Sequence, residues 1–207
     1  MEVYKFGGAS VKNAEAVKNF LNVLKLQAKS PNVVVVSAMD KTTNALEAVV
    51  NCYFIDRKSV KSLLQDVRKF HSTILIDLFE DDKHPIYHII GSFFEGASRF
   101  LDTNKSNNYN FVYDQIVGVG ELASTSIISH FLNDHGIENE WLDARELIKT
   151  DDVYRSASLN LNETQNNINR AINLGKIYIT QGFIGSDSNN FTTTLGREGS
   201  DYSAAIF

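Results

Sequence analysis

The sequence predicts an α/β fold built on a mainly parallel central sheet. A short apolar strand at residues 3–6 is followed by a glycine turn, a segment with helical spacing and a valine-rich strand, which is the order of a right-handed βαβ unit. A later strand, at 176–181, runs directly into a second glycine-rich segment. With 207 residues, of which 43% are hydrophobic, the chain can bury a substantial core and fits one domain.

The first 37 residues carry the clearest pattern. "VYKF" at 3–6 is expected to be a strand and "GGAS" at 7–10 a turn. Apolar residues then recur at helical spacing, namely Ala16, Val17, Phe20, Leu21 and Leu24. "NVVVVS" at 32–37 is a continuous β-branched run, which is typical of a strand buried on both faces in a parallel sheet.

Residues from about 45 to 115 predict amphipathic helices, and we interpret them as a helical insertion in the α/β core. The segment 59–79 shows the pattern best. Its apolar residues that share one face are Val60, Leu63, Leu64, Val67, Phe70 and Ile74.

The last 90 residues return to alternating helices and strands. In "GVGELASTSIISHFLNDHG" at 118–136 we expect a glycine turn and then a helix with Leu122, Ile128, Phe131 and Leu132 inward, ending at Gly136. "NEWLD" at 139–143 and "KIYITQ" at 176–181 predict strands, and the segment from 182 predicts a loop that leads into a helix near Asp201. Because the chain stops within that helix at "SAAIF", we expect it to be a fragment of a longer protein.

Composition excludes several classes of function. The net charge is −5 and no basic block occurs, so nucleic acid is not an expected partner. No stretch approaches the ~20 apolar residues of a membrane span, and the start has no signal-peptide pattern. The single cysteine, Cys52, and the five scattered histidines give no zinc-ligand spacing. We therefore expect a soluble cytoplasmic protein without a metal centre of its own.

The first candidate site is "KFGGAS" at 5–10. Lys5 ends a strand, Gly7 and Gly8 let the backbone approach a ligand, and Ser10 precedes a helix whose N-terminus favours anions. These residues fit a phosphate cradle, although the spacing matches neither the P-loop nor the dinucleotide fingerprint. A tight strand-to-helix turn with an exposed lysine fits the same residues equally well.

The second candidate site is "TTTLGREGSD" at 192–201, at another strand-to-helix junction where open parallel sheets bind ligands. The Arg197 guanidinium suits a carboxylate, and the Asp201 carboxylate suits either orienting Lys5 or holding Mg²⁺. Ser200 and Asp201 also fit a simple helix N-cap pair.

Two further candidates come from the middle of the chain. Glu121 is expected in the first turn of the helix that follows "GVG", where it either binds a ligand or complements the helix dipole. Ser37 and Thr43 follow the valine-rich strand, and ordinary helix capping explains them about as well as a ligand site does.

Taken together, "KFGGASV", "VVSAMDKTTNAL", "GELAS" and "ITQGFIGSDSNNFTTTLGREGSDYSAA" resemble the catalytic domain of aspartokinases. The resemblance runs in order along nearly the whole chain. It implies the amino-acid kinase fold, a three-layer αβα sandwich with a mainly parallel central sheet. It also implies transfer of the γ-phosphate of ATP, with Mg²⁺, to the side-chain carboxylate of L-aspartate, the first step of lysine, threonine and methionine synthesis.

The resemblance also implies roles for the candidate residues. Lys5, organised by Asp201, would act on the transferring phosphate, and the other phosphate-binding residues would be Gly7, Gly8, Ser10 and Ser200. Arg197 would bind the α-carboxylate of aspartate, Glu121 its α-ammonium, and Thr43 and Ser37 would form hydrogen bonds with it. Mg²⁺ would arrive with ATP, with Asp201 as a further candidate ligand.

Some features depart from the family pattern. Ala9 replaces the threonine of "FGGTS", and Glu198 occupies the variable position of the G-R-x-G-S-D motif. The family's nucleotide-base segment and regulatory ACT domains are not among residues 1–207, so we expect this chain alone to be weakly active or inactive and its parent to be a homo-oligomer. The alternatives are another amino-acid kinase, of the glutamate 5-kinase or acetylglutamate kinase type, and a catalytically silent regulatory module of the same fold.

Overall fold

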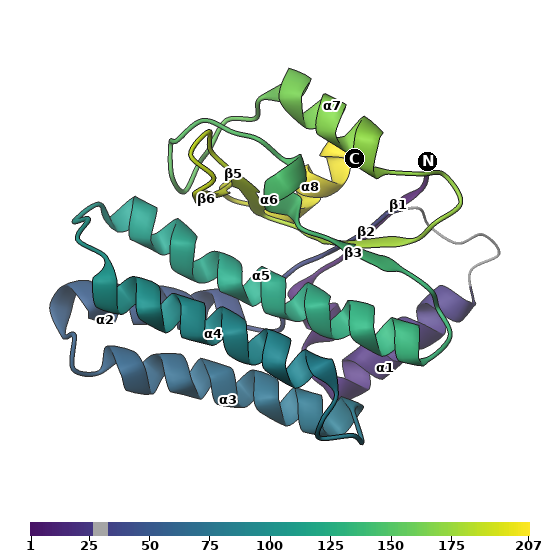
Figure 1. Ribbon diagram of the computed structural model, residues 1–207, viewed down its shortest axis with the longest axis horizontal. Coiled ribbons are helices and arrows are strands. Elements are labelled where there is room, and N and C mark those ends of the chain that lie inside the picture. The colour runs from purple at the N-terminus through teal and green to yellow at the C-terminus, as the bar shows by residue number, and fades with distance from the viewer. Residues whose placement is uncertain (27–32) are drawn as a thin grey trace.

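The computed structural model describes residues 1–26 and 33–207, and its centre is a four-stranded parallel sheet (Figure 1). The strands are β1 (Val3–Phe6), β2 (Val33–Val36), β3 (Glu140–Leu142) and β4 (Tyr178–Gln181), in the order β1-β2-β4-β3. The predicted parallel sheet is therefore confirmed. Asn32, which we placed at the start of the second strand, lies outside the described residues.

Strand β2 lies between β1 and β4, and all four of its valines are fully buried. Val34 and Val36 join a core cluster that contains apolar residues of the first five α-helices. Val33 and Val35 alternate to the opposite face, where α8 (Gly199–Ile206) packs on β1 and β2. The valine run is thus buried on both faces, as its composition predicts.

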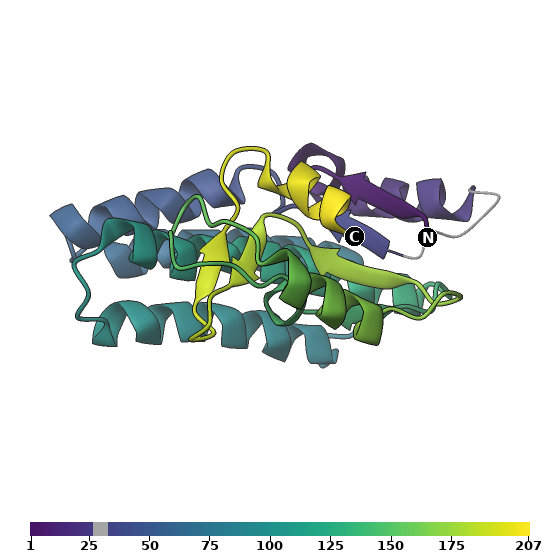
Figure 2. The same cartoon turned by 90° about the horizontal axis from the view of Figure 1, so that it is seen from above.

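Helices cover both sides of the sheet (Figures 1 and 2). The larger layer holds α1 (Ala14–Lys25), α2 (Thr42–Ile55), α3 (Val60–Leu78), α4 (Pro85–Thr103) and α5 (Tyr109–Asp134), and α2, α3, α4 and α5 pack on one another. The other side holds α6 (Ala144–Leu147), α7 (Leu161–Ala171) and α8. No helix in the described part of the chain has the length and apolar character needed to cross a bilayer.

Helix α5 corrects the prediction for residues 118–136. It begins at Tyr109, with the Asn108 side chain accepting the N–H groups of Asn110 and Phe111, so no turn occurs at Gly118 or Gly120. The two glycines instead let α5 approach its neighbours closely. A Cβ at Gly118 would lie 3.0 Å from Thr192 Cγ2, and one at Gly120 would lie 2.8 Å from Thr42 Cγ2.

The segment predicted as a loop after β4 also differs. It contains a short antiparallel hairpin of β5 (Ile184–Ser186) and β6 (Thr192–Thr194). Two residues of α5 hold this hairpin: Gln115 exchanges hydrogen bonds with the backbone of Thr192, and Asp114 binds Thr194. The hairpin is therefore fixed by contacts with a helix about 80 residues earlier in the chain, which the local sequence of the hairpin does not reveal.

Candidate functional site

Sequence-distant candidate residues meet at one pocket of about 340 Å³. It lies at the carboxyl ends of β1, β2 and β4, the edge where open parallel sheets bind ligands. The pocket-lining residues that the sequence singled out are Lys5, Ser37, Thr43, Glu121, Arg197, Ser200 and Asp201. The lining also includes Phe183, Gly196, Glu198 and Gly199.

Lys5 and Asp201, 196 positions apart in the chain, form an ion pair across the pocket rim. The Lys5 Nζ atom lies 3.1 Å from Asp201 Oδ1 and 3.2 Å from Oδ2. The Lys5 side chain is 28% exposed and that of Asp201 63% exposed. An ion pair this exposed adds little to the stability of the fold. Its main effect is to orient the Lys5 ammonium.

Gly7, Gly8 and Ser10 lie beside Lys5 but are not part of the pocket lining. A Cβ at Gly8 would lie 2.5 Å from the Ala38 carbonyl oxygen, so Gly8 is required where the turn passes the 38–40 segment. A Cβ at Gly7 would lie 3.7 Å from Lys5 Nζ. The turn continues as a 3₁₀ helix at Gly8–Val11, and α1 starts only at Ala14, so the α-helix N-terminus expected at Ser10 is displaced.

Glu121 is the most unusual group of the pocket. The residue is only 2% exposed, and burial raises the pKa of its carboxyl to about 8, against hydrogen bonds from the Ala38 backbone and the Thr43 side chain that lower it. Its Oε2 atom has no hydrogen-bond partner among the described residues. A buried, half-satisfied carboxylate that lines a pocket is suited to a cationic ligand.

The dipole alternative for Glu121 does not hold, because Glu121 lies in the middle of α5 and not in its first turn. Capping does not explain Thr43 either: Lys41 is the N-cap of α2, and no side-chain cap bond forms there. Ser37 continues β2, where its N–H donates to the Phe6 carbonyl. Its own carbonyl accepts a hydrogen bond from Ser124 Oγ of α5 at 2.8 Å.

Arg197 points into solvent, with 94% of its side chain exposed, and its nearest charged neighbour is Glu198 at 4.0 Å. Glu198 is the N-cap of α8 and has a left-handed backbone, with φ 58° and no side-chain cap bond. The N-cap alternative for Ser200 and Asp201 is therefore wrong. Both residues lie inside the first turn of α8, where they face the pocket.

Sequence reasoning missed two contributors. Phe183 lines the pocket with a left-handed backbone, φ 72°, and its N–H donates to Ser203 Oγ at 2.9 Å. Asp114 is fully buried and accepts hydrogen bonds that hold the segment before Arg197. No local sequence motif points to Phe183. The sequence signal that could have identified Asp114 is its acidic side chain in a largely apolar helical pattern.

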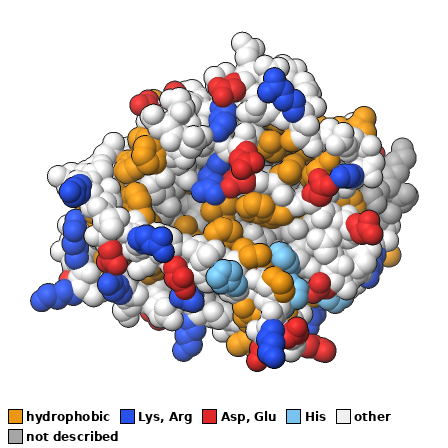
Figure 3. Space-filling model, viewed as in Figure 1, with side chains coloured by type: hydrophobic (Ala, Val, Ile, Leu, Met, Phe, Trp, Pro, Cys, Tyr) orange, Lys and Arg blue, Asp and Glu red, His pale blue; other side chains and the backbone are white. Residues whose placement is uncertain are grey.

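The described residues offer few side chains that could bind a metal ion. Within residues 1–26 and 33–207, no three His, Cys, Asp or Glu side chains are grouped to hold one. Histidine side chains do lie near one another on the face drawn in Figure 3, and His84 at the start of α4 lies close to His130 near the end of α5. His84 lies 3.3 Å from Asp134 and its ring centre 5.4 Å from that of His130. Asp201 is the pocket carboxylate that pairs with Lys5, so it is already engaged with that ammonium.

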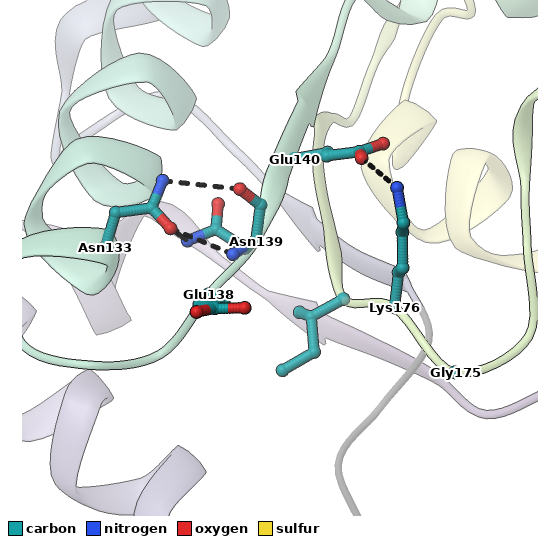
Figure 4. A pocket seen from close by; sticks show the side chains of 7 residues that line it. Asn133, Glu138, Asn139, Glu140, Gly175 and Lys176 are labelled. Atoms are coloured by element: carbon teal, nitrogen blue, oxygen red, sulfur yellow. Dashed lines mark hydrogen bonds and ion pairs between the residues drawn. The ribbon is translucent and has the colours of Figure 1, made fainter.

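A larger hollow, of about 510 Å³, lies at the amino ends of β3 and β4 (Figure 4). Its polar side chains largely pair with one another. Asn133 exchanges hydrogen bonds with Asn139, and Lys176 pairs with Glu140. The hollow therefore lacks the unsatisfied buried charge that distinguishes the Glu121 pocket.

Comparison with known families and structures identifies the family of the chain. The model of the amino acid kinase family matches residues 1–207. The chain is 30% identical to lysine-sensitive aspartokinase 3 of Escherichia coli, over 99% of this chain and 45% of that protein. It is 32% identical to the aspartokinase of Chlamydia pneumoniae, over 99% of this chain and 43% of that protein.

A longer relative is bifunctional aspartokinase/homoserine dehydrogenase 2 of Arabidopsis thaliana, 30% identical over 99% of this chain and 23% of that protein. Among solved structures, E. coli aspartokinase III in complex with lysine and aspartate superposes with a TM-score of 0.88 at 29% identity, over 100% of this chain and 46% of that one. The same enzyme with aspartate and ADP gives a TM-score of 0.87. The chain thus spans between about a quarter and just under half of the length of these relatives.

Proposed function

The chain belongs to the amino acid kinase family, and we propose that it carries the aspartate site of an aspartokinase. In this reaction a side-chain carboxylate oxygen of L-aspartate attacks the γ-phosphorus of MgATP. The bond from that phosphorus to the β–γ bridging oxygen breaks, and 4-phospho-L-aspartate and ADP form. The similarity to aspartokinases over nearly the whole chain supports the proposal. We further propose that this is the entry step of lysine, threonine and methionine synthesis and that the whole protein is a cytoplasmic homo-oligomer.

The observation that carries the proposal is the unpartnered buried carboxylate oxygen of Glu121 in a pocket that also contains an exposed arginine. An α-amino acid with a free ammonium and two carboxylates needs one anionic and one cationic partner. Glu121 suits the ammonium and Arg197 the α-carboxylate, because a guanidinium binds a carboxylate with two parallel hydrogen bonds. The Thr43 and Ser37 hydroxyls add neutral hydrogen bonds beside Glu121. An N-acetylated substrate has no ammonium, so it would leave Glu121 without a partner.

Lys5 and Ser200 of the pocket lining would face the phosphates, together with the adjacent turn that contains Gly7, Gly8 and Ser10. In phosphoryl transfer the protein mainly positions the reactants and stabilises charge on the equatorial oxygens. Lys5, directed by Asp201, would supply that charge next to the attacked phosphorus. Mg²⁺ would enter with the nucleotide and neutralise its phosphates. Asp201, the carboxylate beside Lys5, would be a further ligand for Mg²⁺.

The test is trapping of aspartyl phosphate by hydroxylamine with MgATP and L-aspartate. It should be run on residues 1–207 and on the whole protein to which they belong. We expect turnover by the whole protein and little or none by residues 1–207. We also expect calorimetric titration of L-aspartate to detect binding to the chain itself. Preferred turnover of glutamate or of an N-acetylated amino acid would replace this proposal by another amino-acid kinase. Binding of aspartate without any phosphoryl transfer by the whole protein would indicate a silent regulatory module.

A further inference from the structure

Asp114 of α5 forms a buried junction between three parts of the chain. The residue has no exposed surface. Its Oδ2 atom accepts the Thr194 N–H at 2.9 Å and the Arg155 N–H at 3.0 Å, and its Oδ1 atom accepts the Thr194 hydroxyl at 2.8 Å. One carboxylate therefore holds the end of β6 and the 151–157 segment on the same helix.

Thr194 is three residues before Arg197, and the residues between them are held from both sides. The Leu195 N–H donates to the Phe183 carbonyl at 2.9 Å, and the Thr194 carbonyl accepts the Ala157 N–H at 3.0 Å. Gly196 lies against the 151–157 segment, and a Cβ there would be in van der Waals contact with the Arg155 carbonyl oxygen, at 3.4 Å. Because the Arg197 side chain makes almost no contacts of its own, its location follows from these backbone contacts.

The 151–157 segment is itself fixed to the helical layer through Arg155. This residue has a left-handed backbone, with φ 71°, a conformation that costs free energy for any residue other than glycine. Its guanidinium lies 4.2 Å from the ring centre of Tyr113 and 3.2 Å from Glu47 of α2. The contacts of Arg155 with Tyr113 and Glu47 therefore also hold the 151–157 segment against the helical layer.

Helix α5 thus determines the positions of both charged partners of the proposed aspartate site. It carries Glu121 directly, and through Asp114, seven residues earlier, it holds the segment that carries Arg197. Seven residues are about 10 Å along a helix axis, and the helix makes this spacing rigid. We propose, resting on the function proposed above, that Asp114 is a positioning residue that fixes the Arg197 segment relative to Glu121, and so helps the site select aspartate over the longer glutamate.

Two variants separate positioning from a general contribution to the fold. Asp114→Asn keeps the geometry, because the amide oxygen accepts both N–H groups and the amide N–H₂ donates to the Thr194 hydroxyl, which is free to rotate. Asp114→Leu keeps the branched shape with bulkier methyl groups in place of the two oxygens, and it leaves all three donors unpaired. Thr164→Val is the matched control: it removes a buried hydroxyl that accepts the Lys149 N–H, on α7 and outside the pocket lining.

The first measurement is steady-state kinetics of the whole protein with aspartate and with glutamate. In Asp114→Leu the KM for aspartate should rise about tenfold or more, because small displacements of a binding group are costly, while the KM for ATP stays within about threefold. The ratio of kcat/KM for aspartate to that for glutamate should fall about tenfold. In Asp114→Asn the KM for aspartate and the aspartate-to-glutamate ratio of kcat/KM should both stay near the wild-type values. Thr164→Val should change neither quantity.

The second measurement is hydrogen exchange of residues 1–207, which does not depend on turnover. Asp114→Leu should speed exchange of the Thr194 and Arg155 amides and leave the β4 amides protected. Unchanged exchange, or an unchanged aspartate-to-glutamate ratio in an active Asp114→Leu enzyme, would refute the positioning role. A wild-type protein that phosphorylates no aspartate would instead refute the proposed function and with it the selectivity, while the exchange result still decides whether Asp114 holds the segment.

Discussion

At the scale of single residues, the protonation state of Glu121 decides whether the pocket binds a cation. Burial raises the pKa of Glu121 to about 8, so most molecules at neutral pH have an uncharged carboxyl there. An ammonium within hydrogen-bond distance favours the charged form. Binding of aspartate below pH 8 should therefore expel the Glu121 proton.

We predict that aspartate affinity falls about tenfold for each pH unit below the Glu121 pKa and levels off above it. Isothermal titration in two buffers of different ionisation enthalpy should show release of nearly one proton per aspartate at pH 7. Glu121→Gln is the control: it should weaken aspartate binding by about 30-fold or more and abolish the linked proton release, because the ammonium loses its charged partner. Proton release that survives in Glu121→Gln would assign the titration to another group.

Lys5 should contribute to the rate and almost nothing to stability. We predict that Lys5→Met lowers kcat of the whole protein by about 10² to 10³, as does loss of one preorganised charge-stabilising donor elsewhere. The melting temperature should hardly change, because the lost ion pair with Asp201 is exposed. Lys61→Met is the matched control, since Lys61 also has an exposed carboxylate partner, Asp102 at 3.5 Å. An undiminished kcat in Lys5→Met would exclude Lys5 from the phosphate site.

At the scale of elements, the packing of α5 on the 38–42 segment brings Glu121 to Thr43. The approach depends on Gly120, where a Cβ would lie 2.8 Å from Thr42 Cγ2 and 3.2 Å from Ala38 Cβ. The two glycines of "GVG" at 118–120 predict a turn at this point of the sequence. Turns and close helix contacts both require glycine, and only the apolar pattern extending back to Tyr109 distinguishes them.

Gly120→Ala should move α5 away from the 38–42 segment. We predict a loss of about 1–2 kcal/mol in unfolding free energy, because overpacking exceeds the gain in helix propensity, and a rise in the KM for aspartate. Gly96→Ala in α4 is the control, since a Cβ there meets nothing within 4 Å. It should stabilise the protein by up to about 1 kcal/mol and leave the KM unchanged. Urea unfolding and steady-state kinetics measure both effects, and a stabilised Gly120→Ala protein would contradict the packing explanation.

At the scale of the whole molecule, the parallel sheet could be predicted from the sequence because it depends on local patterns, and seven of the candidate site residues line one pocket. The valine run indicates burial on both faces, Lys5 lies near the end of a strand that a glycine turn follows, and Arg197 lies in a glycine-rich segment after another strand. The contacts that join those pieces are not local. The β5–β6 hairpin is held by Asp114 and Gln115, about 80 residues earlier, and the sequence pattern contains no sign of that pairing.

His71 links the helical layer to the stability of the whole molecule. It is fully buried between the rings of Phe70 and Phe94, its Nδ1 atom lies 2.9 Å from the Val67 carbonyl oxygen, and its Nε2 atom has no partner in the described ranges. Burial lowers the pKa of His71 to about 4, from its ordinary value of 6.5. The unfolded chain therefore binds a proton between pH 6.5 and 4 that the folded chain does not, so this residue's contribution to stability is lost as pH falls through that range.

Glu121 and Asp114 act in the opposite direction, because burial raises the pKa of Glu121 to about 8 and that of Asp114 to about 6. The effect of His71 must therefore be measured as a difference. Between pH 7 and pH 5, His71→Leu should gain about 2 kcal/mol in unfolding free energy relative to the wild type, measured by urea denaturation. Phe94→Leu alters the same core region without a titratable group, so its difference from the wild type should not change with pH. A constant difference for His71→Leu would mean that His71 is already protonated, or exposed, in the folded protein at pH 5.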